Sequence, residues 1–144
     1  DTYNSLGTVY GELGELQKEK NWYEKSIQIN PNNSKPYWNL HSHALDIDKA
    51  LLERYGSVST QTAESMAENV MKKFSTNIGI SVTGIAGPTG GTEDKPVGLV
   101  YIGLAHESGV KVKEIRYGND RKRNKLRTSQ AALNLLRLFL LKIR

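Results

Sequence analysis

Residues 83–98 read TGIAGPTGGTEDKPVG and hold five glycines and two prolines, with no charged side chain before Glu93. Glycine has no Cβ, so a chain rich in glycine lets backbone N–H groups approach an anion closely. The stretch therefore predicts a loop that could bind a phosphate or carboxylate group. The plainer alternative is a long surface loop that binds nothing.

Two well-known phosphate-binding loops are excluded by the residues around this stretch. No Gly-Lys-Ser/Thr follows it, so it is not a P-loop. The pattern GxGxxG is absent, so it is not a dinucleotide fingerprint. Apolar residues before and after the stretch indicate that it connects two strands, whereas both of those loops open a helix.

A metal or cofactor site is not predicted. His41, His43, Asp46 and Asp48 are the one cluster of metal-ligating residue types, and a solvated turn explains them more simply. The chain has no cysteine, which excludes disulfides and thiolate metal sites. We therefore expect no metal and no cofactor.

The net charge of +5 is unevenly distributed along the 144 residues. Residues 111–127 contain eight Lys or Arg against two acids. Such a cluster favours an anionic partner, although a solvated helix start is the alternative. Nucleic acid is not predicted as the partner, since Tyr117 is the only aromatic side chain within the cluster.

Membrane insertion is not expected, because no apolar run approaches the roughly 18 residues of a membrane span. The first 14 residues also lack the basic start and apolar centre of a signal peptide. Together with the absence of cysteine, these features predict a cytoplasmic protein.

The glycine loop needs elements to position it, and the apolar periodicity predicts them. Helical spacing covers 59–74, and strand patterns cover 78–82, 97–105 and 110–115. A last helix follows Asn119 or Asp120 as its N-cap. The order helix–strand–strand–strand–helix predicts an α/β fold, part of a three-layer α/β/α unit.

Local signals refine these elements. Ser59 is expected to cap the first helix, after an earlier helix that stops at Tyr55-Gly56, and Ser108-Gly109 is expected to form the hairpin turn. The buried side of the last helix is expected to carry four leucines, namely Leu126, Leu133, Leu136 and Leu140.

Residues 1–42 differ in style and contain an internal repeat with a period of 34, in which Tyr3 and Leu6 recur as Tyr37 and Leu40. The spacing within the first unit resembles the tetratricopeptide repeat family at Tyr3, Leu6, Gly7, Tyr10, Tyr23, Ser26 and Pro31. Glu19 departs from that pattern, and the second unit fails after Leu40. We therefore predict a repeat-like helical segment at 1–42 and an α/β segment at 43–144.

Three stretches of the α/β segment have the pattern and order of a known family, namely LLERYGSVS (51–59), SVTGIAGPTGGTEDKPVGLVYIGLA (81–105) and NDRKRNKLRTSQAALNLL (119–136). On these stretches the segment is similar to the CinA C-terminal domain, the competence/damage-inducible family that includes nicotinamide mononucleotide deamidases. This similarity implies a three-layer fold and hydrolysis of an amide, with Lys95 holding the loop. The substrate-binding residues that it implies are Thr83, Gly84, Gly87, Gly90, Gly91 and Arg121.

The resemblance covers only the second half of the family's domain. The family carries its serine nucleophile in the first half, in an Ala-Glu-Ser-Cys-Thr-Gly-Gly-like stretch, which we do not find here. Thr62-Ala63-Glu64-Ser65 imitates its start, but no glycines follow, and Ser65 falls within an amphipathic helix. We therefore predict no catalytic residue.

Several hypotheses about function remain open. The chain is an inactive relative of the deamidases that could still bind a nucleotide or phosphate, an amidohydrolase that retains activity, or an interaction module that uses its helical hairpin. A recombined chain, natural or engineered, is an account of origin compatible with each. A sheet without its first-half strands has an exposed edge, so a homo-oligomer is also predicted.

Overall fold

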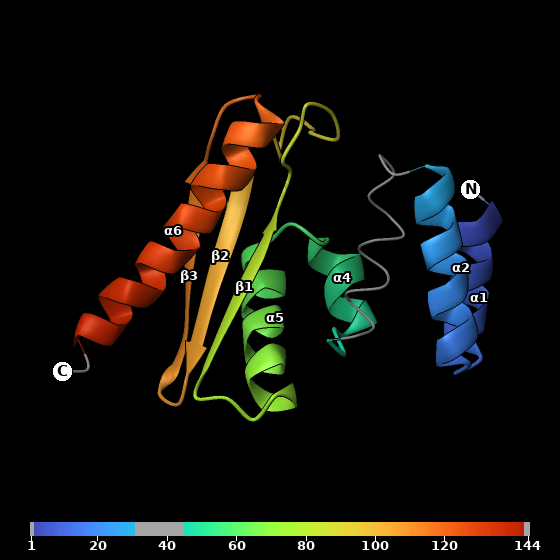
Figure 1. Cartoon of the computed structure of the whole chain (residues 1–144), viewed down its shortest axis with the longest axis horizontal. Helices are drawn as coiled ribbons and strands as arrows, with labels where there is room; N and C mark the ends of the chain where they lie inside the picture. The colour runs from blue at the N-terminus through green and yellow to red at the C-terminus, as the bar shows by residue number, and fades with distance from the viewer. Residues whose placement is uncertain (1, 31–44, 143–144) are drawn as a thin grey trace. The chain divides into compact units, whose positions relative to one another are not determined.

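A computed structural model describes residues 2–30 and 45–142, which divide into two compact units, Asp1–Asp46 and Ile47–Arg144 (Figure 1). Each unit is considered by itself. The predicted boundary between residues 42 and 43 lies outside the described residues, as do His41 and His43, so this boundary stays a prediction.

The first unit is a helical hairpin, as expected for a repeat-like segment. Helices α1 (Thr2–Glu12) and α2 (Leu16–Ile29) are joined by a turn in which Gly14 has a φ of 72°. Gly7 lies against the ring of Tyr23, where a Cβ would collide with the aromatic carbons. Glycine at this position therefore allows the two helices to pack closely.

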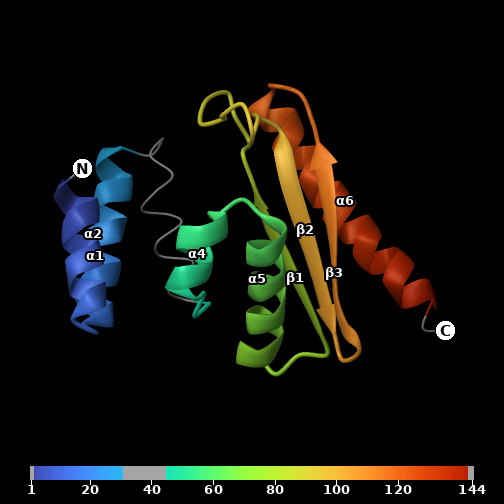
Figure 2. The ribbon, with the colours of Figure 1, turned by 180° about the vertical axis from the view of Figure 1, so that it is seen from behind.

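The second unit is a three-stranded antiparallel sheet between helices. It contains six elements: α4 (Lys49–Tyr55), α5 (Thr60–Lys73), β1 (Ile78–Gly84), β2 (Leu99–His106), β3 (Gly109–Arg116) and α6 (Arg121–Lys142). The strand order is β1-β2-β3, with α5 on one face and α6 on the other (Figures 1 and 2). This arrangement confirms the predicted α/β fold and its order of elements.

Small residues bring α5 unusually close to the sheet. Ala63 and Ala67 are fully buried on α5, and they face glycines of the sheet. A Cβ added at Gly103 would lie 2.5 Å from the carbonyl oxygen of Ala63, and one added at Gly79 would meet that of Ala67. The hydroxyl of Ser81 donates a hydrogen bond to the same Ala63 oxygen, which ties the helix to β1.

The predicted buried face of α6 is wrong for three of its four leucines. Leu126, Leu133 and Leu140 are 61%, 66% and 46% exposed, while Leu136 is half-buried. The buried residues are instead Asn124, Thr128 and Ala132. The side-chain amide of Asn124 bonds to two backbone carbonyls beyond the end of the sheet. These bonds fix the rotation of the helix, so Ala132, flanked by Ala131 and Leu135, packs against Val100 and Ile102 of β2.

The expected caps are present. Ser59 accepts a hydrogen bond from the N–H of Thr62 at the start of α5, and Asp120 accepts one from the N–H of Arg123 at the start of α6. The hairpin turn lies one residue earlier than predicted, since His106 pairs with Gly109. Within 2–30 and 45–142, no helix has both the length and the apolar character needed to cross a membrane.

Candidate functional site

The glycine loop joins β1 to β2 at the end of the sheet where α6 begins (Figure 1). Its base is closed by backbone hydrogen bonds. The N–H of Ile85 donates to Leu99 O at 2.9 Å, and the N–H of Gly98 donates to Ile85 O at 2.7 Å. The loop is therefore anchored to the ladder on both sides.

Two side chains at the start of α6 hold the loop from above its base. The guanidinium of Arg121 donates through Nη1 to Gly87 O at 3.0 Å. The amide of Asn124 donates to Ala86 O at 3.0 Å and to Gly118 O at 2.7 Å, and this residue is only 2% exposed. Arg121 and Asn124 thus donate hydrogen bonds to carbonyl oxygens of the loop.

A third side chain ties the loop to α4. The ammonium of Lys95 donates to Tyr55 O at 2.7 Å, at the last residue of that helix. A cation bonded to the final carbonyls of a helix also complements its dipole. Lys95 therefore holds the loop by hydrogen bonding, which is the role that the resemblance implied.

Replacing Lys95 by methionine is expected to lower the free energy of unfolding of the α/β unit by about 1 kcal/mol. Methionine keeps most of the apolar stem and removes only the charged donor. Chemical denaturation followed by circular dichroism measures the change. The matched variant Lys111→Met, at an exposed position of β3, should change stability by less than about 0.5 kcal/mol. Equal effects of the two substitutions would contradict an anchoring role for Lys95.

The backbone N–H groups of the loop are free to face a ligand. Among the described residues, no group accepts a hydrogen bond from the N–H of Ala86, Gly87, Thr89, Gly90 or Gly91. Gly87 and Gly90 have φ angles of 84° and 90°, in the left-handed region that favours glycine. Carbonyls held by side chains and unbonded N–H groups are the arrangement that an anion-binding loop needs.

The site residues implied by the resemblance belong to different parts of the α/β unit. Gly87, Gly90 and Gly91 belong to the loop, and Arg121 contacts it. Gly84 is still part of β1, opposite Val100. The hydroxyl of Thr83 donates to Ser57 O at 2.6 Å, so Thr83 is directed toward the chain before α5. Their contact with a ligand stays a prediction.

Asn124 was missed by sequence reasoning. A buried amide on a helix resembles any exposed asparagine when only its type is known. Its spacing to Thr128 and Ala132, four residues apart each time, marks one helical face. The preference for leucine as the buried residue type concealed that face.

No serine or threonine hydroxyl described from Ile47 onward is arranged as a nucleophile. Ser65 lies half-buried within α5, as expected. Among the described residues from Ile47 onward, no serine or threonine hydroxyl is hydrogen-bonded to a His, Asp or Glu side chain. A serine amidase needs such a base to accept the proton.

His106 is the only described histidine, and it lies at the wrong end of the sheet. It pairs with Ile78 at the start of β1, whereas Gly84 at the end of β1 leads into the glycine loop. Six residues of extended strand separate these ends by roughly 20 Å. Its Nδ1 accepts a hydrogen bond from the N–H of Ser108, and its ring packs on Phe139. His106 therefore cannot serve as a base at the loop.

The charged residues around the sheet are solvated. All eight basic residues between 111 and 127 are exposed, and Arg116 and Arg123 pair with the neighbouring acids Glu114 and Asp120. Within the described part of the chain, no group of three or more His, Cys, Asp or Glu could hold a metal ion. Asp48 accepts a hydrogen bond from the N–H of Ala50 as the cap of α4.

The pKa of Tyr101 is raised, first because the phenol is desolvated by burial and then because the carboxylate of Glu114 lies opposite it on β3. A raised pKa means that the phenol stays neutral at physiological pH. Tyr101 is therefore a structural neighbour of Glu114 and not an activated base.

Two family models match this chain. The model of the CinA C-terminal domain matches residues 37–140, and the model of a tetratricopeptide repeat matches residues 1–33. Both resemblances inferred from sequence motifs are thereby confirmed.

Individual relatives support the match to the CinA family. The chain is 48% identical over 100 residues to a competence-damage inducible protein of Acetivibrio thermocellus and 50% identical over 99 residues to a CinA-like protein of Dictyoglomus thermophilum. Each match covers 69% of this chain and 24% of the relative. The chain thus spans about a quarter of the length of the curated relatives that it matches.

Solved structures share the fold. A competence/damage inducible protein from Agrobacterium tumefaciens superposes with a TM-score of 0.65 at 38% identity, over 68% of this chain and 61% of that one. A CinA superfamily protein from Klebsiella pneumoniae gives a TM-score of 0.64 at 20% identity, over 68% of this chain and 61% of its own, which is a likeness of fold alone.

Proposed function

This chain belongs to the CinA C-terminal domain family, and we propose that its glycine loop binds the phosphate of nicotinamide mononucleotide, or a closely related nucleotide, without hydrolysing the amide. The family resemblance supplies the ligand class. The glycine loop of this chain supplies the binding site. The chain by itself is catalytically inactive.

The binding proposal rests on a difference between the carbonyl and N–H groups of the loop: two carbonyl oxygens accept hydrogen bonds from side chains, whereas several N–H groups have no acceptor among the described residues. Arg121 and Asn124 bond to the carbonyl oxygens of Gly87 and Ala86. The N–H groups of Gly87, Gly90 and Gly91 bond to no described residue. Backbone N–H groups without an acceptor carry partial positive charge, which suits a phosphate. The nearby exposed basic residues at the start of α6 add an attractive field.

Inactivity is supported by what surrounds the loop. Within the described part of the α/β unit, no serine or threonine hydroxyl is bonded to a side chain that could act as its base, and His106 lies about 20 Å away along the sheet. Free N–H groups could stabilise an oxyanion, but stabilisation without a nucleophile does not form the acyl-enzyme.

Titrating the protein with nicotinamide mononucleotide tests the binding proposal. In two-dimensional NMR spectra of the amide groups, the ligand should shift the signals of Gly87, Gly90 and Gly91. Inorganic phosphate should compete for the same signals. The variant Gly90→Ala strains a φ of 90° while leaving room for the methyl group, and it should weaken binding roughly tenfold.

Gly109→Ala is the matched control, since Gly109 also has a positive φ but lies in the hairpin at the opposite end of the sheet. It should leave the affinity unchanged. Ligand-induced shifts that avoid the loop would contradict the binding proposal. Ammonia released from nicotinamide mononucleotide by the purified chain, above the rate of the Gly90→Ala variant, would contradict the proposed inactivity.

The first unit supports a second role. Residues 1–33 match a tetratricopeptide repeat, and Val9, Leu13 and Ile29 of this hairpin are 50%, 65% and 61% exposed. A single repeat cannot bury a continuous core, so these side chains are available to a protein partner. Two adjoining matches to different families also support a recombined origin for the chain.

A further inference from the structure

The two edges of the sheet differ in charge. Strand β3, at one edge, reads GVKVKEIR and carries charged side chains at four of eight positions. Strand β1, at the other edge, reads IGISVTG and has neither a charge nor a proline. Charged residues and prolines are the usual protection of an edge strand against pairing with another chain. The β3 edge is therefore protected, and the β1 edge is not.

The outer edge of β1 presents unused hydrogen-bonding groups. Ile85 donates its N–H to Leu99 O and so faces β2. Along an antiparallel ladder, the backbone N–H and C=O groups of successive residues point alternately toward the paired strand and away from it. Since Ile85 points toward β2, the N–H and C=O groups of Ile80 and Val82 point away from β2. Among the described residues, β2 is the only strand that pairs with β1.

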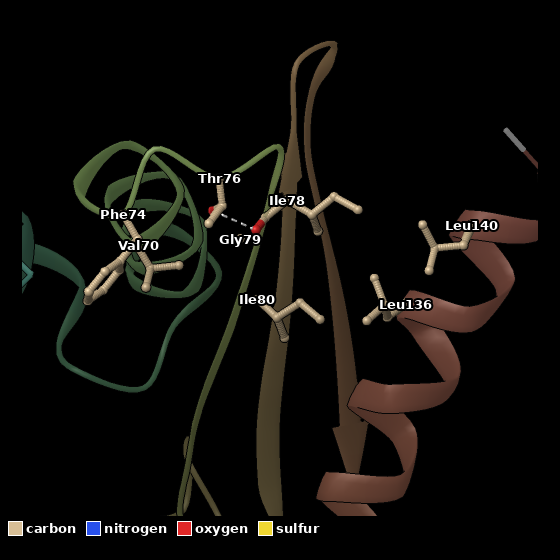
Figure 3. A pocket seen from close by; sticks show the side chains of 8 residues that line it. All are labelled: Val70, Phe74, Thr76, Ile78, Gly79, Ile80, Leu136 and Leu140. Atoms are coloured by element: carbon tan, nitrogen blue, oxygen red, sulfur yellow. Dashed lines mark hydrogen bonds between the residues drawn. The ribbon is translucent and has the colours of Figure 1, made fainter.

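Apolar side chains extend past this edge on both faces of the sheet. They line what we call the β1 groove, formed by Val70, Phe74, Thr76, Ile78, Gly79, Ile80, Leu136 and Leu140. Figure 3 shows Val70 of α5 directed toward β1 from one side, and Leu136 and Leu140 of α6 directed toward Ile78 and Ile80 from the other. Phe74, which directly follows α5, turns its ring away from the strand. None of the eight residues is charged, and Phe74 is 66% exposed.

We propose that the β1 edge and the β1 groove are covered by the same surface of a second copy of this chain. The two β1 strands pair antiparallel about a two-fold axis, which joins the two three-stranded sheets into one. Ile80 then lies opposite Val82 of the second copy, with both side chains on the α6 face. The helices of each layer meet their counterparts across the axis.

Charge favours a second copy as the occupant. A two-fold axis places a surface against itself, so any net charge on the surface meets the same sign. The chain carries a net charge of +5, yet the β1 groove has none, and two copies can meet there without like-charge repulsion. The β3 edge, with Lys111, Lys113 and Arg116, would repel its own copy. This proposal does not depend on ligand binding at the glycine loop.

Light scattering after size-exclusion chromatography tests the proposal on the full chain. The expected mass is twice the 16.1 kDa of one chain. Val82→Lys places a cation on the edge at a residue that is already 41% exposed, so the fold should survive, and the dimer should weaken at least about tenfold. The matched control is Val9→Lys, at a 50% exposed valine of α1, which should leave the dimer intact.

Amide hydrogen exchange supplies a readout without mutation. The N–H groups of Ile80 and Val82 should become protected as the protein concentration rises, because only the second copy covers them. A monomer at every concentration would overturn the proposal. So would a dimer that Val9→Lys dissociates and Val82→Lys does not, which would place the interface on the first unit. Protection in a monomer would mean that a segment of the same chain covers the edge.

Discussion

Replacing Gly103 by alanine is expected to lower the free energy of unfolding of the α/β unit by about 3 kcal/mol. Gly103 lies at the middle of the central strand β2, and an added Cβ would lie 2.5 Å from the Ala63 carbonyl oxygen and 2.6 Å from the Ser81 hydroxyl. Neither neighbour can move freely, because Ala63 is fully buried and the two are hydrogen-bonded to each other. The methyl group must therefore push α5 away from the sheet.

Amide hydrogen exchange of β2 at increasing urea concentrations measures this loss in the α/β unit alone. Gly118→Ala is the control, since no atom lies within 4 Å of the position where its Cβ would be placed and its φ is not positive. It should change stability by less than about 0.5 kcal/mol. If Gly103→Ala were equally mild, the helix and sheet would not be in the close contact described here.

Replacing Asn124 should also have a large effect, and the choice of substitution separates its causes. Asn124→Ala removes both hydrogen bonds and leaves the carbonyls of Ala86 and Gly118 without their donor, at a cost of about 2–3 kcal/mol. Asn124→Asp keeps the shape but buries a carboxylate against two carbonyl oxygens. We expect that variant to lose about 4 kcal/mol at neutral pH.

The aspartate variant should regain stability on acidification. Burial and the facing carbonyls raise the pKa of Asp above its unfolded value of about 4. The folded state then binds a proton more tightly than the unfolded state, so stability rises as pH falls from 7 toward 5. Urea denaturation at both pH values measures the recovery. Asn134→Asp, at an exposed position of the same helix, should show almost no loss and no such recovery.

Local signals predicted the elements of the fold well, because each depended on a short stretch of chain. Ser59 as a cap and Gly56 as a stop depend on backbone geometry within one helical turn, and both are present. The alternation from Ile78 to Val82 likewise marks β1. The buried face of α6 was wrong because it depends on which residues bond to the loop, and that is a contact between residues far apart in sequence.

The candidate site was only partly accessible from sequence. Glycines at 87, 90 and 91 are recognisable as loop residues by type alone. The anchoring bonds from Arg121 and Asn124 to loop carbonyls connect positions 34 and 38 residues apart. No periodicity links the loop to these positions. The resemblance indicated Arg121, whereas Asn124 was marked only as a member of one helical face with Thr128 and Ala132.

The charges on β3 have a consequence for how large an assembly can become. From the register, Lys111 and Lys113 lie on one side of the strand and Glu114 and Arg116 on the other, so both faces of this edge are solvated. A sheet that gains a neighbour at β1 therefore has no second site for growth. Under the proposed pairing, addition would stop after one step and give a closed particle and not a fibril, even at the high concentrations where an unprotected pair of edges would polymerise.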